Sequence, residues 1–272
     1  MYRTIIALLL LLSLGCASVT TTDTSCPPAP PPYQPTAEQV ELDTIYSLLA
    51  YAVVYVNWQP ATQESRGYNI GSVLVDPEDN VVCWAVNSVG VTGNGTQHGE
   101  VRLITNYVGN TRTFSLPKHA IYTTLEPCAM CSGMMTMQSI AKTVYGQRDP
   151  DYGATLERLA LNSTAAGGYC PFPRTVVSVE TESEFAAALD RGYARYHATT
   201  KEPRLTRFLA SSEAQQIYAA AYKAFLDYKP VHAANEARLA AAREFLRGVP
   251  TSYMPIPYTT NCPAGSAAAP VP

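Results

Sequence analysis

The chain has 272 residues, a formal net charge of −3 and 47% hydrophobic residues, a composition typical of a globular protein with one large or two modest domains. The excess of acidic over basic residues argues against a nucleic acid as the partner. Beyond the N-terminus, no apolar run is long enough to cross a membrane.

The first 17 residues have the pattern of a secretory signal. Arg3 precedes a short apolar run over residues 5–12, which is too short for a transmembrane helix. Residues 14–18 also resemble a bacterial lipoprotein box, in which Cys16 would be the lipidated first residue of the mature protein. Simple cleavage after Ala17 or Ser18 is the alternative. Either way we expect an exported protein, which is periplasmic, an outer-membrane lipoprotein or secreted, with membrane contact only through a lipid on Cys16.

Proline-rich segments flank the part of the chain that can fold. Residues 18–35 are rich in Thr and Pro and predict an extended linker, and residues 249–272 form a second Pro-rich tail. Between them, we expect one domain over residues 36–197 and a helical extension over residues 198–248.

The predicted elements alternate between helix and strand. Residues 36–58 have apolar positions at helical spacing, with Thr36 and Gln39 as a capping box. The other segments follow in chain order: strands over 70–75 and 81–86, a Gly-rich loop over 88–97, a helix from His98 to about Gly109, a strand over 120–125, a helix over 128–138, a strand over 143–145, a helix over 156–161, a strand over 175–179, and helices over 183–196, 204–228 and 233–246. This alternation predicts an α/β sandwich with helices on both faces of the sheet.

Two cysteines form the first chemical motif. Cys128 and Cys131 follow Pro127, a residue suited to the first turn of a helix, so both thiols lie where the helix dipole favours thiolate. At this spacing they share one helix face and can bind one metal ion. A redox pair or half of a structural zinc site would have the same spacing.

An upstream motif, His98-Gly99-Glu100, distinguishes between these alternatives. Alone, His98 and Glu100 would be ordinary residues of a helix N-terminus. Together the two motifs match the His-x-Glu and Pro-Cys-x-x-Cys signature of zinc-dependent nucleobase deaminases. Three protein ligands (His98, Cys128 and Cys131) leave the fourth zinc position open, which is typical of a catalytic site. Glu100 can then serve as the general acid and base.

Residues 70 to about 195 resemble the cytidine deaminase-like superfamily, most closely its tRNA-adenosine deaminase and guanine deaminase branch. The similar segments are residues 71–75, 98–100, 124–131 and 144–146. The resemblance implies a three-layer α-β-α sandwich around a five-stranded mixed sheet, with zinc as cofactor between the two motif helices, and it makes residues 36–197 the catalytic domain. It also implies substrate contacts by Asn87 and Glu126, although Asn87 is equally a common turn residue. At Gly99 the chain departs from that branch, which usually has Ala.

The remaining cysteines (Cys26, Cys83, Cys170 and Cys262) are even in number, and export permits disulfides. A bridge between Cys26 and Cys262 would tie the two Pro-rich tails together. Four cysteines allow three pairings, and spacing does not select one. Cys83 lies inside a predicted strand and is expected to be a buried free thiol.

Three functions remain open. The first is a zinc-dependent hydrolytic deaminase that acts on a small nucleobase, nucleoside or nucleotide outside the cytoplasm. The second is a deaminase of nucleic acid, either similar to the tRNA-adenosine deaminases or an exported toxin; the basic stretch over residues 191–207 could meet phosphates, or be a solvated helix face. The third is a non-catalytic zinc-containing binding protein. We also expect the C-terminal helices to cap the pocket or to form a homo-oligomer contact.

Overall fold

The computed structural model describes residue 26, residues 32–60, residues 66–250 and residue 262. The predicted signal segment (1–17), most of the linker (18–35) and most of the Pro-rich tail (249–272) lie outside the described residues. Within the described part of the chain, no helix has both the length and the apolar character needed to span a membrane.

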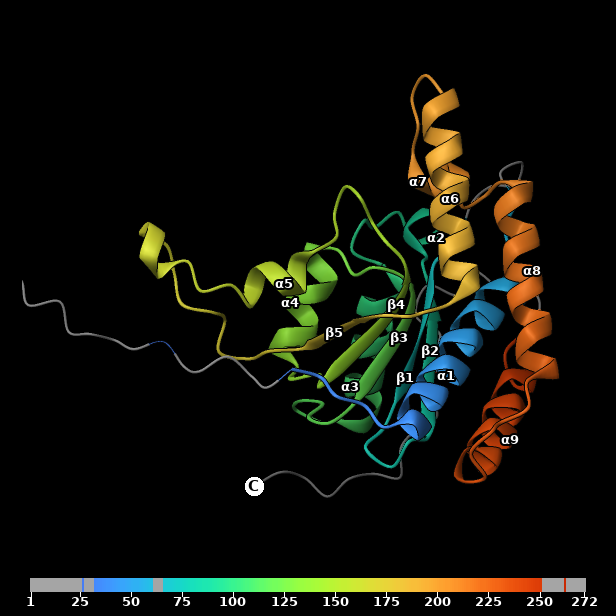
Figure 1. The fold of residues 1–272 in the computed structure, drawn as a ribbon, viewed down its shortest axis with the longest axis horizontal. Coiled ribbons are helices and arrows are strands. Elements are labelled where there is room, and N and C mark those ends of the chain that lie inside the picture. The colour runs from blue at the N-terminus through green and yellow to red at the C-terminus, as the bar shows by residue number, and fades with distance from the viewer. Residues whose placement is uncertain (1–25, 27–31, 61–65, 251–261, 263–272) are drawn as a thin grey trace, which may run out of the picture.

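A five-stranded mixed sheet forms the centre of the molecule (Figure 1). Its strands are β1 (Gly71–Val75), β2 (Val81–Val86), β3 (Ala120–Leu125), β4 (Lys142–Gln147) and β5 (Val177–Glu180), in the order β2-β1-β3-β4-β5. β1 pairs antiparallel with β2 and β3, whereas β3, β4 and β5 run parallel. The predicted mixed sheet and all its strands are therefore confirmed, with ends shifted by a few residues.

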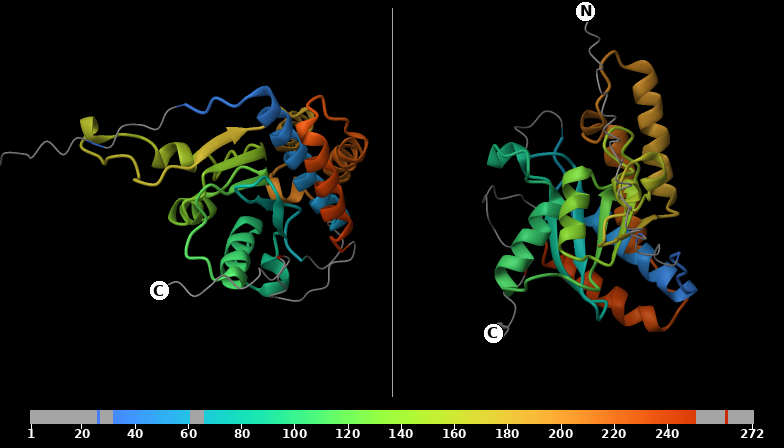
Figure 2. Two further views of the ribbon diagram at one scale, coloured as in Figure 1. Left: turned by 90° about the horizontal axis from the view of Figure 1, so that it is seen from below. Right: turned by 90° about the vertical axis from the view of Figure 1, so that its left-hand side faces the viewer.

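Helices cover both faces of this sheet. α3 (Gly99–Thr111) and α4 (Ala129–Met137) cover one face, with α5 (Thr155–Leu159) beside α4, and α1 (Ala37–Val56) covers the other (Figures 1 and 2). Alternate strand residues point to opposite faces: Leu74 and Ile121 join the core under α3, while Val73 and Tyr122 join the core under α1. The predicted α-β-α sandwich is confirmed.

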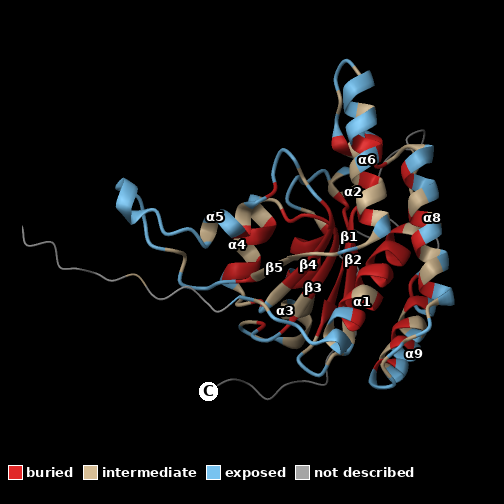
Figure 3. Ribbon diagram, viewed as in Figure 1, coloured by how far each residue is buried: buried red, intermediate tan, exposed pale blue. Residues whose placement is uncertain are grey.

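α1 is buried around almost its whole circumference. It packs on the sheet with one side, while α8 (Ser212–Asp227) and α9 (Ala234–Arg247) cover its other side (Figure 3). Thr36 caps α1 as predicted, because its Oγ1 accepts a hydrogen bond from the backbone N–H of Gln39 at 3.1 Å. The second half of the capping box is wrong, since the Gln39 amide donates to Asp43 at 2.9 Å instead.

The C-terminal extension is part of the same hydrophobic core as α1. α6 (Glu184–Thr199) is followed by a short helix, α7 (Leu205–Phe208), and then by α8. The single helix predicted over residues 204–228 is therefore wrong: Ser211 ends it, because its side chain accepts from Ala214 N and starts a new helix. The predicted Gly-rich loop also contains a short helix, α2 (Val89–Thr92), and a 3-10 turn (η1, Thr164–Ala166) lies in the chain between α5 and β5.

Two disulfides join Cys26 to Cys170 and Cys83 to Cys262. The predicted bridge between Cys26 and Cys262 and the predicted free thiol at Cys83 are both wrong. Cys83 is fully buried in β2 on the face under α3. Cys262 reaches that face, where its carbonyl accepts from the Asn110 side chain of α3 at 3.3 Å. The two cysteines of the tails thus attach to different sides of the fold, which sequence spacing could not reveal.

Candidate metal centre

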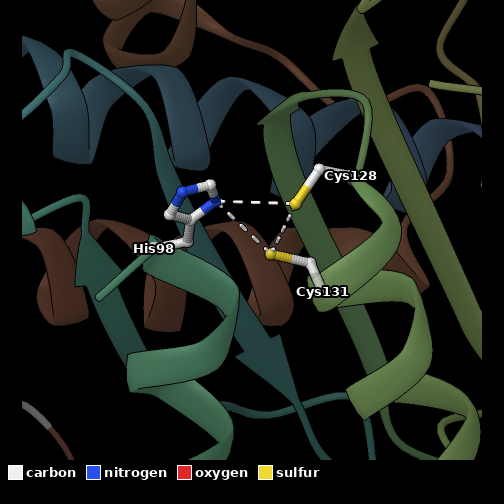
Figure 4. A group of neighbouring side chains, drawn as sticks. All are labelled: His98, Cys128 and Cys131. Atoms are coloured by element: carbon white, nitrogen blue, oxygen red, sulfur yellow. Dashed lines mark hydrogen bonds between the residues drawn. The ribbon is translucent and has the colours of Figure 1, made fainter. Parts of the chain in front are cut away.

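The two motifs place three potential metal ligands at neighbouring helix N-termini (Figure 4). His98 is the N-cap of α3 and Cys128 is the N-cap of α4, both with extended backbones. Cys131 lies in the first turn of α4 and is completely buried. The sequence prediction that each motif starts a helix is correct to within one residue.

The three ligand atoms form a nearly equilateral triangle. The distances from His98 Nδ1 to Cys128 Sγ, from His98 Nδ1 to Cys131 Sγ and between the two sulfurs are all 3.7 Å. Tetrahedral zinc with ordinary bond lengths places nitrogen and sulfur ligands about 3.6 Å apart and two sulfur ligands about 3.8 Å apart. The side chains therefore fit a zinc ion with three protein ligands.

The electrostatics of the triangle also suit a cation. The hydrogen bond with Cys131 and a second one with His98 lower the pKa of the Cys128 thiol to about 4. The hydrogen bond with Cys128 raises the pKa of the His98 imidazole. The same bond, together with burial, raises the pKa of the Cys131 thiol. Cys128 is thus a thiolate at neutral pH, and thiolate and imidazole are the donors that zinc prefers.

Glu100 lies beside this triangle in the first turn of α3. Its side chain is nearly inaccessible, with 3% exposure, and burial raises the pKa of its carboxyl. Oε2 lies 3.5 Å from Cys131 Sγ, and Oε1 accepts a hydrogen bond from Thr123 Oγ1 at 3.3 Å. The carboxylate is close to the ligands without belonging to the triangle.

A cavity of about 650 Å³ opens onto the triangle. Both motifs contribute to its lining, and so do residues 203–206, which form the end of the α6–α7 connection and the start of α7. The expectation that the C-terminal helices contribute to the pocket is confirmed for this segment. Its role was not evident from its sequence, because only the packing of α7 and α8 on the α1 core brings it to the cavity. The lining residues are Tyr68, Ile70, Gly95, His98, Glu100, Leu125, Glu126, Cys128, Ala129, Met130, Asp149, Asp151, Tyr152, Pro203, Arg204, Leu205 and Thr206.

Glu126 borders the cavity, but its carboxylate binds the protein itself. Oε2 accepts from the backbone N–H of Asp149 at 3.0 Å, and Oε1 accepts from that of Ala154 at 2.6 Å. A Cβ on Gly153 would collide with this carboxylate. Glu126 therefore shapes the loop after β4, and its contact with substrate stays a prediction.

Asn87 is buried at the end of β2 and is absent from the cavity lining among the described residues. Its Oδ1 accepts from the backbone N–H groups of Tyr68 at 3.1 Å and of Val89 at 3.2 Å. The second bond is the turn-forming contact that was the alternative interpretation of this residue. Asn87 thus holds Tyr68, which does line the cavity, and its own contact with a base stays a prediction.

Together the fold and the site define a three-layer α/β protein with a His-Cys-Cys zinc site at two helix N-termini. Residues 48–147 match the family model described as the cytidine and deoxycytidylate deaminase zinc-binding region. Over 123 residues the chain is 31% identical to a "Probable cytosine deaminase" of Schizosaccharomyces pombe. The aligned segment makes up 45% of this chain and 69% of that relative.

Two bacterial tRNA-specific adenosine deaminases are also similar. The protein of Agrobacterium fabrum is 32% identical over 123 residues, which are 44% of this chain and 76% of that relative. The protein of Haemophilus influenzae is 34% identical over 85 residues, which are 31% of this chain and 49% of that relative, so the match spans about half of its length. The chain belongs to the cytidine and deoxycytidylate deaminase family, whose members are zinc-dependent hydrolases of C–N bonds.

Proposed function

We propose that this protein is a hydrolytic deaminase that releases ammonia from a free nucleobase, nucleoside or nucleotide outside the cytoplasm. The observation that carries the proposal is Glu100, a buried carboxylate that lines the cavity and lies beside three well-placed zinc ligands. A structural zinc site has no use for a carboxylate in that place. The third hypothesis, a non-catalytic binding protein, does not account for it.

In this proposal each residue of the site has one task. His98, Cys128 and Cys131 hold zinc, which supplies the Lewis acidity that makes water a nucleophile near neutral pH. Glu100 takes a proton from the attacking water on Oε2 and transfers it to the ring nitrogen, and it then carries the second proton to the departing amine. The C–O bond forms as water adds to the ring carbon, and the C–N bond breaks as that C–O bond becomes a carbonyl, so one water is consumed and one ammonia leaves. Burial favours the protonated form of Glu100 between these transfers.

The charges around the cavity favour a small substrate. Its lining contains the acidic residues Glu100, Glu126, Asp149 and Asp151, and Arg204 supplies the guanidinium in the same lining. An acidic lining repels a polyphosphate backbone, which nucleic-acid-binding proteins attract with Lys and Arg. A volume of about 650 Å³ lies within the usual range for sites that bind small molecules.

A deaminase of nucleic acid is the second candidate. The relatives named as tRNA-specific adenosine deaminases favour it, because they are as similar to this chain as the cytosine deaminase is. Retention on heparin and an activity that falls steeply with salt would support this candidate over the first.

Export is part of the proposal and is supported by the disulfides. Stable disulfides belong to oxidising compartments, and the described residues contain two of them.

A lipid on Cys16 and a homo-oligomeric state are further parts of the proposal. Lipid labelling with intact-mass analysis tests the lipid, and light scattering tests the oligomeric state.

The experiment that tests the function measures ammonia release by the zinc-loaded protein. The panel contains free bases, nucleosides, nucleotides and single-stranded and stem-loop oligonucleotides. We expect turnover of at least one small compound and none of the oligonucleotides. Turnover confined to oligonucleotides would select the second candidate, and no turnover on the whole panel would contradict the proposed function.

A further inference from the structure

A chain of buried hydroxyl groups leads from the sheet to Glu100. Ser72 on β1 and Thr123 on β3 are directly paired in the sheet. Ser72 Oγ donates to Thr123 Oγ1 at 3.0 Å, and Thr123 Oγ1 donates to Glu100 Oε1 at 3.3 Å. The exposed fractions of Ser72, Thr123 and Glu100 are 0%, 2% and 3%, so bulk water does not compete for these bonds.

The donor and acceptor roles fix the direction of this series of hydrogen bonds, from Ser72 through Thr123 to Glu100. A hydroxyl group has a single hydrogen, and because Ser72 donates to Thr123, the hydrogen of Thr123 must go to another acceptor. Two acceptors lie within reach, Glu100 Oε1 at 3.3 Å and the carbonyl of Gly71 at 3.5 Å. The Glu100 oxygen is the closer of the two acceptors, so the Thr123 hydroxyl donates to it.

Gly99 leaves room for the Ser72 hydroxyl. A Cβ at residue 99 would lie 3.3 Å from Ser72 Oγ and 3.2 Å from the carbonyl oxygen of Ala85, both tighter than ordinary contacts. The absence of a side chain at Gly99 therefore leaves the Ser72 hydroxyl the space it occupies in the hydrogen-bonded series.

We infer that Thr123, oriented by Ser72, is a positioning residue that fixes the Glu100 carboxylate for proton transfer. Its bond occupies Oε1, and Oε2 then faces the Cys131 sulfur, on the side of the metal ligands. The inference rests on the proposed function, because it assigns Thr123 to the residue that moves the protons. Thr123 forms no hydrogen bond with a metal ligand in the described interactions, and it is not itself among the residues that line the cavity.

The test compares Thr123→Val, which removes the hydroxyl at nearly constant shape, with Thr123→Ser, which keeps it. Loss of a side chain that orients a group at a metal site typically costs 10- to 100-fold in activity. We expect Thr123→Val to lower kcat about tenfold with KM and zinc content little changed, and Thr123→Ser to recover most of the loss. The matched control is Thr143→Val, because Thr143 is a fully buried threonine of the adjacent strand whose Oγ1 has no hydrogen-bond partner among the described residues. It should leave kcat unchanged.

Three results would overturn the inference: an unchanged kcat in Thr123→Val, equal losses in the Val and Ser variants, or an effect confined to KM. A crystal structure of zinc-loaded Thr123→Val gives a readout without turnover. We expect its Glu100 carboxylate to leave the orientation seen in the wild type, and an unmoved carboxylate would also overturn the inference. Because this readout needs no substrate, an inactive wild type would contradict the proposed function while the positioning role is still tested.

Discussion

Both carboxylate oxygens of Glu126 accept backbone hydrogen bonds from the loop that follows β4. This loop carries Asp149, Asp151 and Tyr152 to the cavity. Ala154, whose backbone N–H donates one of the bonds, has a left-handed backbone with φ of 54°, a conformation that costs free energy in a residue other than glycine. A single side chain therefore holds an unfavourable loop in the shape that forms one wall of the cavity.

Glu126→Gln should loosen this loop. The amide group of Gln has one oxygen acceptor, so it can replace only one of the two bonds, and the loss of one such hydrogen bond costs about 0.5–1.5 kcal/mol. Hydrogen exchange measured by NMR should show faster exchange at the amides of Asp149 and Ala154. The amide of Val177, which donates to the Ala141 carbonyl in the neighbouring sheet region, is the internal control. Unchanged exchange at both loop amides would show that the carboxylate does not hold the loop.

α1 is joined to the sheet by a buried polar cluster on the side away from the metal site. Asp43 of α1 forms an ion pair with Lys142 of β4 at 2.6 Å and accepts from Tyr122 of β3 at 2.7 Å. The side chains of Lys142 and Asp43 are only 12% and 10% exposed. Such a pair fixes how the helix lies on the sheet, because neither charge is stable there without the other.

Lys142→Met should therefore destabilise the fold strongly. Removal of one partner from a buried ion pair costs about 3–5 kcal/mol, and here the Asp43 carboxylate would stay buried without its cation, held only by neutral donors such as Tyr122. Urea denaturation followed by circular dichroism gives the free energy of unfolding. The control is Lys223→Met, which removes an exposed pair with Asp227 on α8 and should change the unfolding free energy little. Equal stabilities of the two variants would contradict the role of the buried pair.

The elements differ in how far their sequences determine them. β1 and β2 are apolar segments joined by the polar turn residues 76–80, which marks both strands. The spacing of His98, Glu100, Cys128 and Cys131 identifies the metal site because few other chemistries need that combination. The break at Ser211 was missed although serine is a common helix cap, since the apolar spacing continues across it. Residues 203–206 carry no local signal for a place at the cavity, because that place depends on the packing of α7 against α6 and of α8 against α1 and α6.

At the scale of the whole molecule, two disulfides close very long loops. They link residues separated by 144 and 179 positions, and a crosslink over so long a loop removes much of the entropy of the unfolded chain. Cys26–Cys170 attaches the N-terminal segment, and Cys83–Cys262 attaches the C-terminal segment under α3.

Peptide mapping under non-reducing conditions should recover the pairs Cys26–Cys170 and Cys83–Cys262. Removal of either bridge by a double Cys→Ser substitution should cost about 2–4 kcal/mol of unfolding free energy, measured by urea denaturation against the wild type. Cys128 and Cys131 should be absent from every disulfide-linked peptide in the zinc-loaded protein, since they are the free cysteines among the described residues. A peptide that joins Cys26 to Cys262 would contradict this account of the chain ends.

The central claim is that Glu100 moves protons at a zinc held by His98, Cys128 and Cys131. The most direct test measures zinc content and ammonia release for the wild type, Glu100→Gln and Cys128→Ala, with the substrate that the wild type turns over. Loss of a general acid–base residue typically costs about 10²- to 10⁴-fold in rate, so Glu100→Gln should retain its zinc and lose activity by that factor, while Cys128→Ala should lose both zinc and activity. A Glu100→Gln variant that deaminates at the wild-type rate with its zinc in place would contradict the claim.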